Sequence, residues 1–209
     1  MFFTKKVIIV VINIIDKIED SVKKHTSEWR NKMGEFKILK RELMHKGKII
    51  DFYKDTLELP DGRQAVWDYI DHKGAAAVVP IDEDGNIILV SQFRNSIKKQ
   101  TLEIPAGGIN KGENPIECAA RELEEETGYT VKSIEPLIDI CTAIAYCNEI
   151  IYVYVAKVGE KKSQHLDEDE FVDVKKFSLK EIEQMILNGT IQDTKTISSI
   201  LSYKLKYLS

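Results

Sequence analysis

The chain has 209 residues, of which 43% are hydrophobic and 31% are charged, and this is the composition of a folded globular protein rather than a disordered one. The formal net charge of −4 argues against a general nucleic-acid-binding protein, which normally carries a basic surface. The three cysteines form no C-x-x-C pair and are odd in number, which excludes a complete disulfide framework and a cysteine zinc site. We therefore expect a reduced, cytoplasmic protein.

The first 33 residues differ in charge from the rest of the chain. They carry seven basic and four acidic side chains, a net +3, which leaves −7 on the other 176 residues. The apolar run 7–15 is shorter than the roughly 20 residues of a membrane-spanning helix, and no small-residue cleavage site follows it, so we expect neither a membrane span nor secretion. We interpret 1–33 as a basic appendage. The alternative is that translation starts at Met33, which N-terminal mass spectrometry finding Met1 would exclude.

Strand patterns and turn signals alternate along the remainder of the chain. The Lys46-Gly47 and Asp61-Gly62 pairs separate the first three strands, and the acidic turn 82–85 joins two further strands as a hairpin. The strands are expected at 35–43, 48–59, 65–70, 75–80, 87–93, 101–104, 134–140, 150–158 and 171–177. The helices are expected at 115–127, 179–187 and 193–205. Many strands with few interspersed helices predict an α/β (α+β) sandwich.

The helix expected at 115–127 has clear signals at both ends. Asn114 can cap its N-terminus, Pro115 suits the first helical position, and Glu117 would complete a capping box. Gly128 is the residue type that commonly follows a helix end. The ends of this helix, and with them the orientation of its side chains, are therefore predicted from local sequence.

Three carboxylates share one face of this helix. At 100° per residue, Glu122, Glu125 and Glu126 fall within about 100° of one another. They lie beside the stripe that we expect to be buried, which consists of Ile116, Ala119, Ala120, Leu123 and Thr127. Like charges this close repel unless a cation lies between them, and carboxylate oxygens suit Mg²⁺ or Mn²⁺. A solvated acidic face is the alternative, so the surrounding pattern has to decide.

The surrounding pattern extends over 23 positions. Residues 107–129 read GGINKGENPIECAARELEEETGY, which fits G-x5-E-x7-R-E-U-x-E-E-x-G-U, where U is a bulky apolar residue. This stretch resembles the signature box of the Nudix hydrolases. The resemblance implies an α/β/α sandwich in which the box forms a loop, a helix and a second loop. It also implies hydrolysis of a nucleoside diphosphate linked to another moiety, with Mg²⁺ or Mn²⁺ as cofactor.

The resemblance also assigns roles to individual residues of the box. It implies that Glu122, Glu125 and Glu126 bind the metal and that Arg121 orients them for catalysis. Glu113 would be an outer partner of this group.

Three further segments resemble the ADP-ribose pyrophosphatase-like branch of this superfamily. They are LEIPAG at 102–107, SQFR at 91–94 and NGTIQDTKT at 188–196. The resemblance covers residues 35–206. It implies that the carbonyl group of Ala106 binds metal and that Arg94 and Glu103 bind substrate.

The acidic loop 167–170 occupies the place where this branch supplies a carboxylate. By similarity, Glu168 is the candidate general base and Glu170 a candidate metal ligand. Metal-bound hydroxide, with Glu125 assisting, is the alternative source of the nucleophile, and an exposed acidic loop without a role is the other interpretation.

The chain departs from the pattern of the branch at two places. Residues 143–145 are Ala-Ile-Ala where the branch often has Ser-Pro-Gly, although Glu149 follows as expected. Trp67 stands where an Arg-Glu pair is common, and it could stack on an adenine ring or simply pack in its strand. Phe93 and Tyr146 are expected in the core. The four histidines show no ligand spacing and are assigned no chemistry.

The sequence therefore predicts a Nudix hydrolase domain at 34–209, with an N-terminal β subdomain at 34–70 and the box at 107–129. The expected reaction is Mg²⁺-dependent hydrolysis of the diphosphate bond of a nucleoside diphosphate sugar, with ADP-ribose giving AMP and ribose 5-phosphate. The alternatives are a GDP-mannose or UDP-sugar pyrophosphohydrolase and, since all box glutamates remain, less favourably a non-catalytic ADP-ribose sensor. Similarity of the 34–70 strands to the branch implies a homodimer, and no nucleic-acid partner is expected.

Overall fold

The structure is a computed structural model that describes residues 34–166, 168 and 170–208. The predicted appendage 1–33 and two residues of the acidic loop, Asp167 and Asp169, lie outside the described residues. Contacts divide the chain into two compact units. One contains Tyr53–Asp68 with the described residues up to Leu43, and the other contains Met44–Phe52 and the chain from Tyr69 onward.

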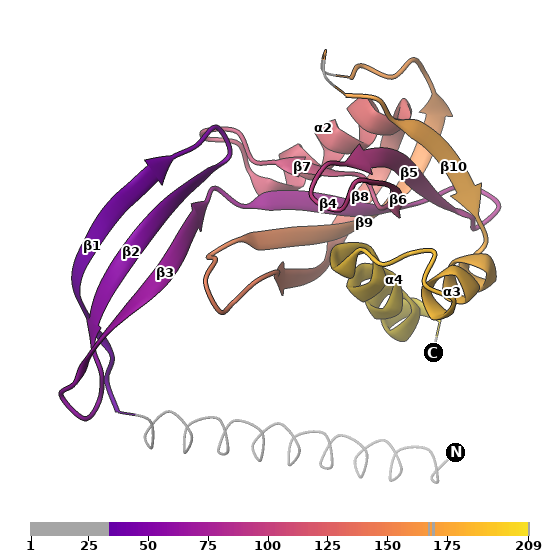
Figure 1. Cartoon of the computed structure of the whole chain (residues 1–209). Coiled ribbons are helices and arrows are strands. Elements are labelled where there is room, and N and C mark those ends of the chain that lie inside the picture. The colour runs from indigo at the N-terminus through magenta and orange to yellow at the C-terminus, as the bar shows by residue number, and fades with distance from the viewer. Residues whose placement is uncertain (1–33, 167, 169, 209) are drawn as a thin grey trace, which may run out of the picture. The chain divides into compact units, whose positions relative to one another are not determined.

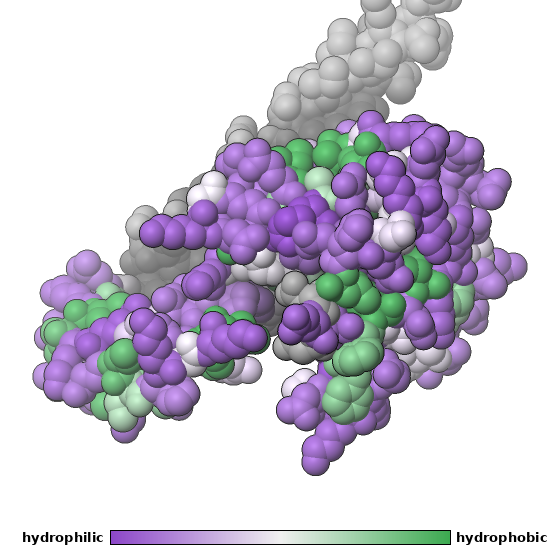
Figure 2. Space-filling model, turned by 90° about the horizontal axis from the view of Figure 1, so that it is seen from above, coloured by the Kyte–Doolittle hydropathy of each residue, from purple (hydrophilic) through white to green (hydrophobic). Residues whose placement is uncertain are grey.

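The first sheet has three strands in the order β1-β2-β3, with β1 at Lys37–Lys46, β2 at Ile50–Glu58 and β3 at Gln64–His72 (Figure 1). Arg41 and Asp55 form a two-point ion pair within it, at 2.7 and 2.6 Å, and Asp55 is buried. The sheet also exposes large apolar side chains, and the part at the left of Figure 2 shows them as green areas between hydrophilic residues. The apolar side chains exposed on the sheet include Ile38, Leu39 and Val66, and Trp67 of β3 and Phe36, just before β1, are about half exposed as well.

The second sheet is mixed and follows the order β10-β5-β4-β9-β8, with β6 paired to β5 and β7 paired to β4. The central strand β4 runs parallel to β9 and antiparallel to β5 and β7. The strands are β4 at Ala75–Ile81, β5 at Ile87–Arg94, β6 at Lys99–Glu103, β7 at Ala106–Gly108, β8 at Tyr129–Cys141, β9 at Ile150–Lys161 and β10 at Asp173–Phe177.

Helices cover both faces of the second sheet (Figure 1). They are α2 at Pro115–Thr127, α3 at Leu179–Leu187 and α4 at Thr194–Tyr207. Successive side chains of a strand point to opposite faces, so Ala76 and Val78 of β4 pack with α2, while Ala77 and Val79 pack with residues of α3 and α4. Two buried apolar clusters therefore fill the two sides of one sheet. This arrangement confirms the predicted α/β/α sandwich.

The predicted helix bounds 115–127 and 179–187 are confirmed, and the third helix extends to Tyr207. Three burial expectations are wrong. Ile116 is exposed. In the first turn of α2, where Ile116 lies, the buried side chain is that of Cys118 instead. Phe93 and Tyr146 are about half exposed, Phe93 near the end of β5 and Tyr146 in the connection before β9. In the part of the chain that the structure describes, no helix is long and apolar enough to cross a membrane.

Candidate active site

The ends of α2 are fixed by the capping interactions expected from the sequence. The Glu117 carboxylate accepts hydrogen bonds of 3.2 Å from the backbone N–H and the side-chain amide of Asn114. At the other end, Gly128 has a φ of 75°, and its N–H donates to the carbonyl oxygen of Glu124 at 2.9 Å. Because a positive φ favours glycine, the helix stops here, just after the box glutamates.

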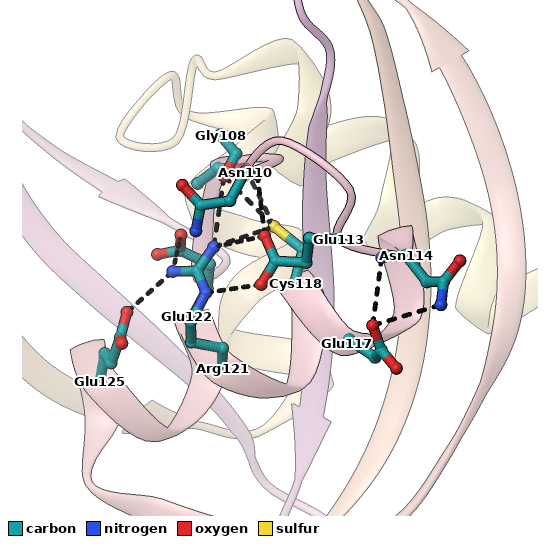
Figure 3. Close-up of polar contacts among 10 residues, drawn as sticks. Gly108, Asn110, Glu113, Asn114, Glu117, Cys118, Arg121, Glu122 and Glu125 are labelled. Atoms are coloured by element: carbon teal, nitrogen blue, oxygen red, sulfur yellow. Dashed lines mark hydrogen bonds and ion pairs between the residues drawn. The ribbon is translucent and has the colours of Figure 1, made fainter.

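Arg121 connects the carboxylates of the box (Figure 3). Its Nε and Nη2 donate to the two oxygens of Glu113, at 2.8 and 3.0 Å. Its Nη1 donates to Glu122 at 2.6 Å and to Glu125 at 2.9 Å. A further bond of 3.2 Å joins Nη2 to the carbonyl oxygen of Gly108. One guanidinium group thus orients three carboxylates and ties the helix to β7, as its five donors in a fixed plane allow.

Glu126 and Glu122 are the two largely buried carboxylates of the acidic face. Glu126 is 3% exposed, and its Oε2 accepts a hydrogen bond of 3.1 Å from the N–H of Ala106. Burial, with a further contribution from the charge of Glu122, raises the pKa of Glu126 to about 8. Burial also raises the pKa of Glu122. Buried carboxylates in this state are stabilised in their charged form by a nearby cation.

The site fits a divalent cation in chemistry and in space. Its donors are carboxylate oxygens, which suit Mg²⁺ and Mn²⁺. A Cβ atom at Gly107 would lie 2.1 Å from the carboxyl carbon of Glu122, so a larger residue there would displace this carboxylate from its present position. Among the described residues, no three His, Cys, Asp or Glu side chains are gathered as a ligand set, and Arg121 bonds to Glu122 and Glu125.

Glu170 lines the same acidic pocket as Glu122 and Glu125, whereas the buried Glu126 is not among the residues that line it. This pocket has a volume of about 400 Å³, and Glu122, Glu125, Glu170 and Gly107 contribute to its lining. Residues from the acidic loop and from α2, more than 40 positions apart in the sequence, are thus brought together. Glu168, the candidate base, is exposed in the same loop.

A larger cavity of about 770 Å³ adjoins the acidic pocket, and Gly107 and Gly108 line both. Arg94, Glu103 and Lys195 line this cavity as well. The short strand β7 therefore contributes to two pockets, one lined by carboxylates and a larger one that contains the positively charged Arg94 and Lys195. This arrangement suits a diphosphate that bridges the two.

Glu103 lies at the centre of a buried ion-pair cluster. Arg94 Nε and Nη2 donate to its two oxygens at 2.8 and 2.5 Å, and Lys195 Nζ bonds to it as well. Lys195 also contacts Asp193 Oδ2 at 2.9 Å and is 8% exposed. Burial alone would raise the pKa of Glu103, but the hydrogen bonds from Arg94 and the charge of Lys195 outweigh it and lower the pKa to about 2. Both oxygens of this predicted substrate-binding residue are therefore occupied by protein partners.

Sequence reasoning missed several residues that the fold brings to the two pockets. His72 lines the large cavity, where its Nδ1 accepts from the N–H of Gly74 at 3.0 Å and lies 3.4 Å from Glu149 Oε1. His165 lines the acidic pocket. Lys195 carried one signal, its place beside Thr196 in the 188–196 stretch, but its partner Glu103 is 92 positions away. The histidines carried none, because their neighbours come from other segments.

Trp67 belongs to the first unit, where its ring centroid lies 5.7 Å from that of Phe36 and its side chain is about half exposed. Its stacking on an adenine ring stays a prediction. Cys118 of α2 is fully buried, and burial raises the pKa of its thiol to about 12. It is therefore protonated at neutral pH.

The chain is similar in sequence to a known protein family and to individual proteins. A family model described as NUDIX domain matches residues 71–199. The chain is 41% identical over 171 residues to a methanol dehydrogenase activator of Bacillus methanolicus, across 81% of this chain and 92% of that protein. It is 39% identical over 175 residues to an ADP-ribose pyrophosphatase of Bacillus subtilis (strain 168), across 82% and 94%.

A solved structure described as an ADP compounds hydrolase has the same fold, with a TM-score of 0.74 over 83% of this chain and 94% of that one, at 21% identity. The family model covers more than half of the chain, and it spans the box helix, the acidic loop and the ion-pair cluster around Glu103. With its box helix, acidic pocket and α/β/α sandwich, the chain belongs to the Nudix family.

Proposed function

We propose that the protein hydrolyses the diphosphate bond of a nucleoside diphosphate sugar with Mg²⁺, and that its substrate is ADP-ribose, which gives AMP and ribose 5-phosphate. The observation that carries this proposal is the pair of pockets that share Gly107 and Gly108, one lined by carboxylates and one containing Arg94 and Lys195. The relative from Bacillus subtilis, named an ADP-ribose pyrophosphatase and similar over nearly its whole length, supports ADP-ribose.

Residues in the acidic pocket and directly beside it would hold the cation. Glu122, Glu125 and Glu126 would bind it, with the carbonyl group of Ala106 and the carboxylate of Glu170 as further ligands. When bound, Mg²⁺ supplies positive charge that offsets the charge developing on the diphosphate. Mn²⁺ is expected to substitute for it.

The other side chains bind and orient the substrate. Arg94 keeps 41% of its side chain exposed while Glu103 fixes its orientation, so its remaining N–H groups can donate to phosphate oxygens. A carboxylate must accept the proton of the attacking water as the bond to the bridging oxygen breaks. Glu168 is the candidate for this role, and Glu125 is the alternative.

The alternative substrates are GDP-mannose and UDP-sugars. A non-catalytic ADP-ribose sensor would need none of the box glutamates, yet all of them are present, and three of them contact Arg121. This favours an enzyme over a sensor.

A panel of nucleotide sugars tests the proposal, with products detected as phosphate released by alkaline phosphatase. We expect ADP-ribose to be hydrolysed faster than GDP-mannose or UDP-glucose in the presence of Mg²⁺. Glu125→Gln and Glu126→Gln should each lower kcat by at least about 10²-fold, whereas the control Glu160→Gln, at an exposed position in β9, should not. Unchanged turnover in the first two variants would show that the metal site is wrongly assigned.

The same assay separates the two candidate bases. If Glu168 removes the proton, Glu168→Gln lowers kcat by more than about tenfold and leaves Mn²⁺ affinity unchanged. A smaller effect, together with a flattened pH–rate profile in Glu125→Gln, assigns the role to Glu125.

We also propose that the protein is a cytoplasmic homodimer. Large apolar side chains such as Ile38, Leu39 and Val66 are exposed on the three-stranded sheet, and patches of this kind commonly mark protein interfaces. Sedimentation velocity at micromolar concentration should give the mass of two chains. A single-chain mass at these concentrations contradicts the dimer.

A further inference from the structure

The segment that leads from β9 to the acidic loop is fastened to the C-terminal turn of α2. The last carbonyl groups of a helix have no partner within it. Here the N–H of His165 donates to the carbonyl oxygen of Glu125 at 3.0 Å, and Gln164 Nε2 donates to that of Glu126 at 2.6 Å. The N–H of Lys162 donates to the carbonyl oxygen of Gly128, also at 2.6 Å. The backbone of two box glutamates is thus bonded directly to this segment.

The side chain of Gln164 also contacts the backbone at the other end of the acidic loop. Its Nε2 also donates to the carbonyl oxygen of Val172, at 3.2 Å. Val172 is buried and immediately precedes β10, which pairs with β5 from Asp173 onward. One half-buried amide group therefore joins three pieces of backbone: its own segment, the end of the box helix and the start of β10.

Glu170 lies between the two ends that Gln164 joins. It lines the acidic pocket with Glu122 and Glu125. The hydrogen bonds of Gln164 fix the described backbone on both sides of Glu170, at the end of α2 and at Val172.

We infer that Gln164 is a positioning residue that holds Glu170 beside the box glutamates and so joins carboxylates from two distant segments into one metal site. Both hydrogen atoms of the amide are used, one on each carbonyl group, and a side chain without these donors cannot replace the link. The expected effect of Gln164 on hydrolysis rests on the proposed function. The expected effect on metal affinity requires only that the site binds a divalent cation.

The test uses Mn²⁺ binding to the full chain, followed by the electron paramagnetic resonance signal of free Mn²⁺. Gln164→Ala removes both donors, and Gln164→Glu keeps the shape while placing a carboxylate against two carbonyl groups. We expect each to weaken Mn²⁺ binding by about tenfold or more, as replacing a residue that orients metal ligands commonly does. Gln184→Ala, at an exposed position of α3, is the matched control and should change the affinity less than about twofold.

A double-mutant cycle separates positioning from a general structural effect. In the Glu170→Gln background, Gln164→Ala should weaken Mn²⁺ binding by less than about twofold, because the residue it positions is already replaced. Additive effects, or unchanged Mn²⁺ affinity in both Gln164 variants, would overturn the inference. Circular dichroism of every variant establishes that the comparison is made on folded protein.

A parallel measurement of ADP-ribose hydrolysis keeps the two proposals apart. We expect Gln164→Ala to lower kcat by about tenfold at saturating Mg²⁺ and to change KM less than about threefold, since the substrate pocket is untouched. If the wild-type chain hydrolyses no nucleotide sugar, the proposed function fails, while the Mn²⁺ cycle still decides the role of Gln164.

Discussion

Replacing Glu103 by glutamine tests whether this residue organises the substrate pocket through its ion pairs. The substitution keeps the shape of the side chain and removes its charge. Arg94 and Lys195 then lose a shared counter-charge, although Lys195 keeps Asp193 and Arg94 remains partly in water. The loss of stability should therefore come mainly from the missing charge of Glu103, and less from new unpaired charge on Arg94 or Lys195.

The size of the effect follows from the pKa of Glu103. The pKa falls from 4.5 to about 2 on folding, and this corresponds to about 3 kcal/mol of stability from the ionised group. Because the pKa is lowered in the folded state, this stability is present above pH 4.5 and is lost as the pH falls toward 2. Glu103→Gln should thus lower the free energy of unfolding by about 3 kcal/mol at pH 7, and the difference from wild type should shrink below pH 4.5.

Urea unfolding followed by circular dichroism measures this difference at several pH values. At pH 7 the unfolding temperature should also fall by about 6–12 °C for a protein of this size. Glu160→Gln, which removes an exposed carboxylate from β9, provides the control and should alter stability by less than about 0.5 kcal/mol. A free energy of unfolding for Glu103→Gln within about 1 kcal/mol of wild type at pH 7 would refute the reasoning. A raised KM without lost stability would instead assign Glu103 to direct contact with substrate.

Three further predictions concern the box. Gly107→Ala should displace the carboxylate of Glu122 and weaken Mn²⁺ binding by about tenfold in a calorimetric titration. The control Gly108→Ala should bind Mn²⁺ normally, because an added Cβ there meets nothing within 4 Å. Equal affinities of the two variants would contradict this prediction. Arg121→Gln removes the positive charge that pairs with three carboxylates, so it should destabilise the protein by about 2 kcal/mol in EDTA. The loss should be smaller in saturating Mg²⁺, because the cation replaces that charge. An equal loss of stability in both buffers would contradict cation binding beside these carboxylates. The buried thiol of Cys118 should react with Ellman's reagent only after unfolding, and its rapid labelling in the native protein, located by mass spectrometry, would be inconsistent with its raised pKa.

The box helix could be predicted from the sequence because its determinants are local. Asn114, Pro115 and Gly128 act within a few residues of the helix ends, and the spacing of the glutamates fixes their common face. The same holds for α3, where Ser178 and Glu181 form a capping box. The three-residue strand β7 was not predicted, since Ala-Gly-Gly carries no strand signal and forms a strand only by pairing with β4.

The rest of the site depends on contacts between distant segments. Lys195 meets Glu103 across 92 positions, and Gln164 meets the end of α2 across 38. Neither residue type reveals its partner, because lysine and glutamine are common on exposed helices and loops. The burial of Glu126 was likewise hidden, since an acidic residue on a helix is usually solvated.

The contribution of β7 to both pockets has a consequence for the evolution of substrate choice. In the proposed function, the carboxylates that would hold the cation come mainly from the box helix, whereas other side chains of the larger cavity, such as Ile97 and Gln192, have no part in the proposed chemistry. Mutations in those outer side chains can change which sugar or base is accepted while the hydrolytic centre stays intact. A family built on this plan can acquire new substrates through small changes on one side of a single three-residue strand.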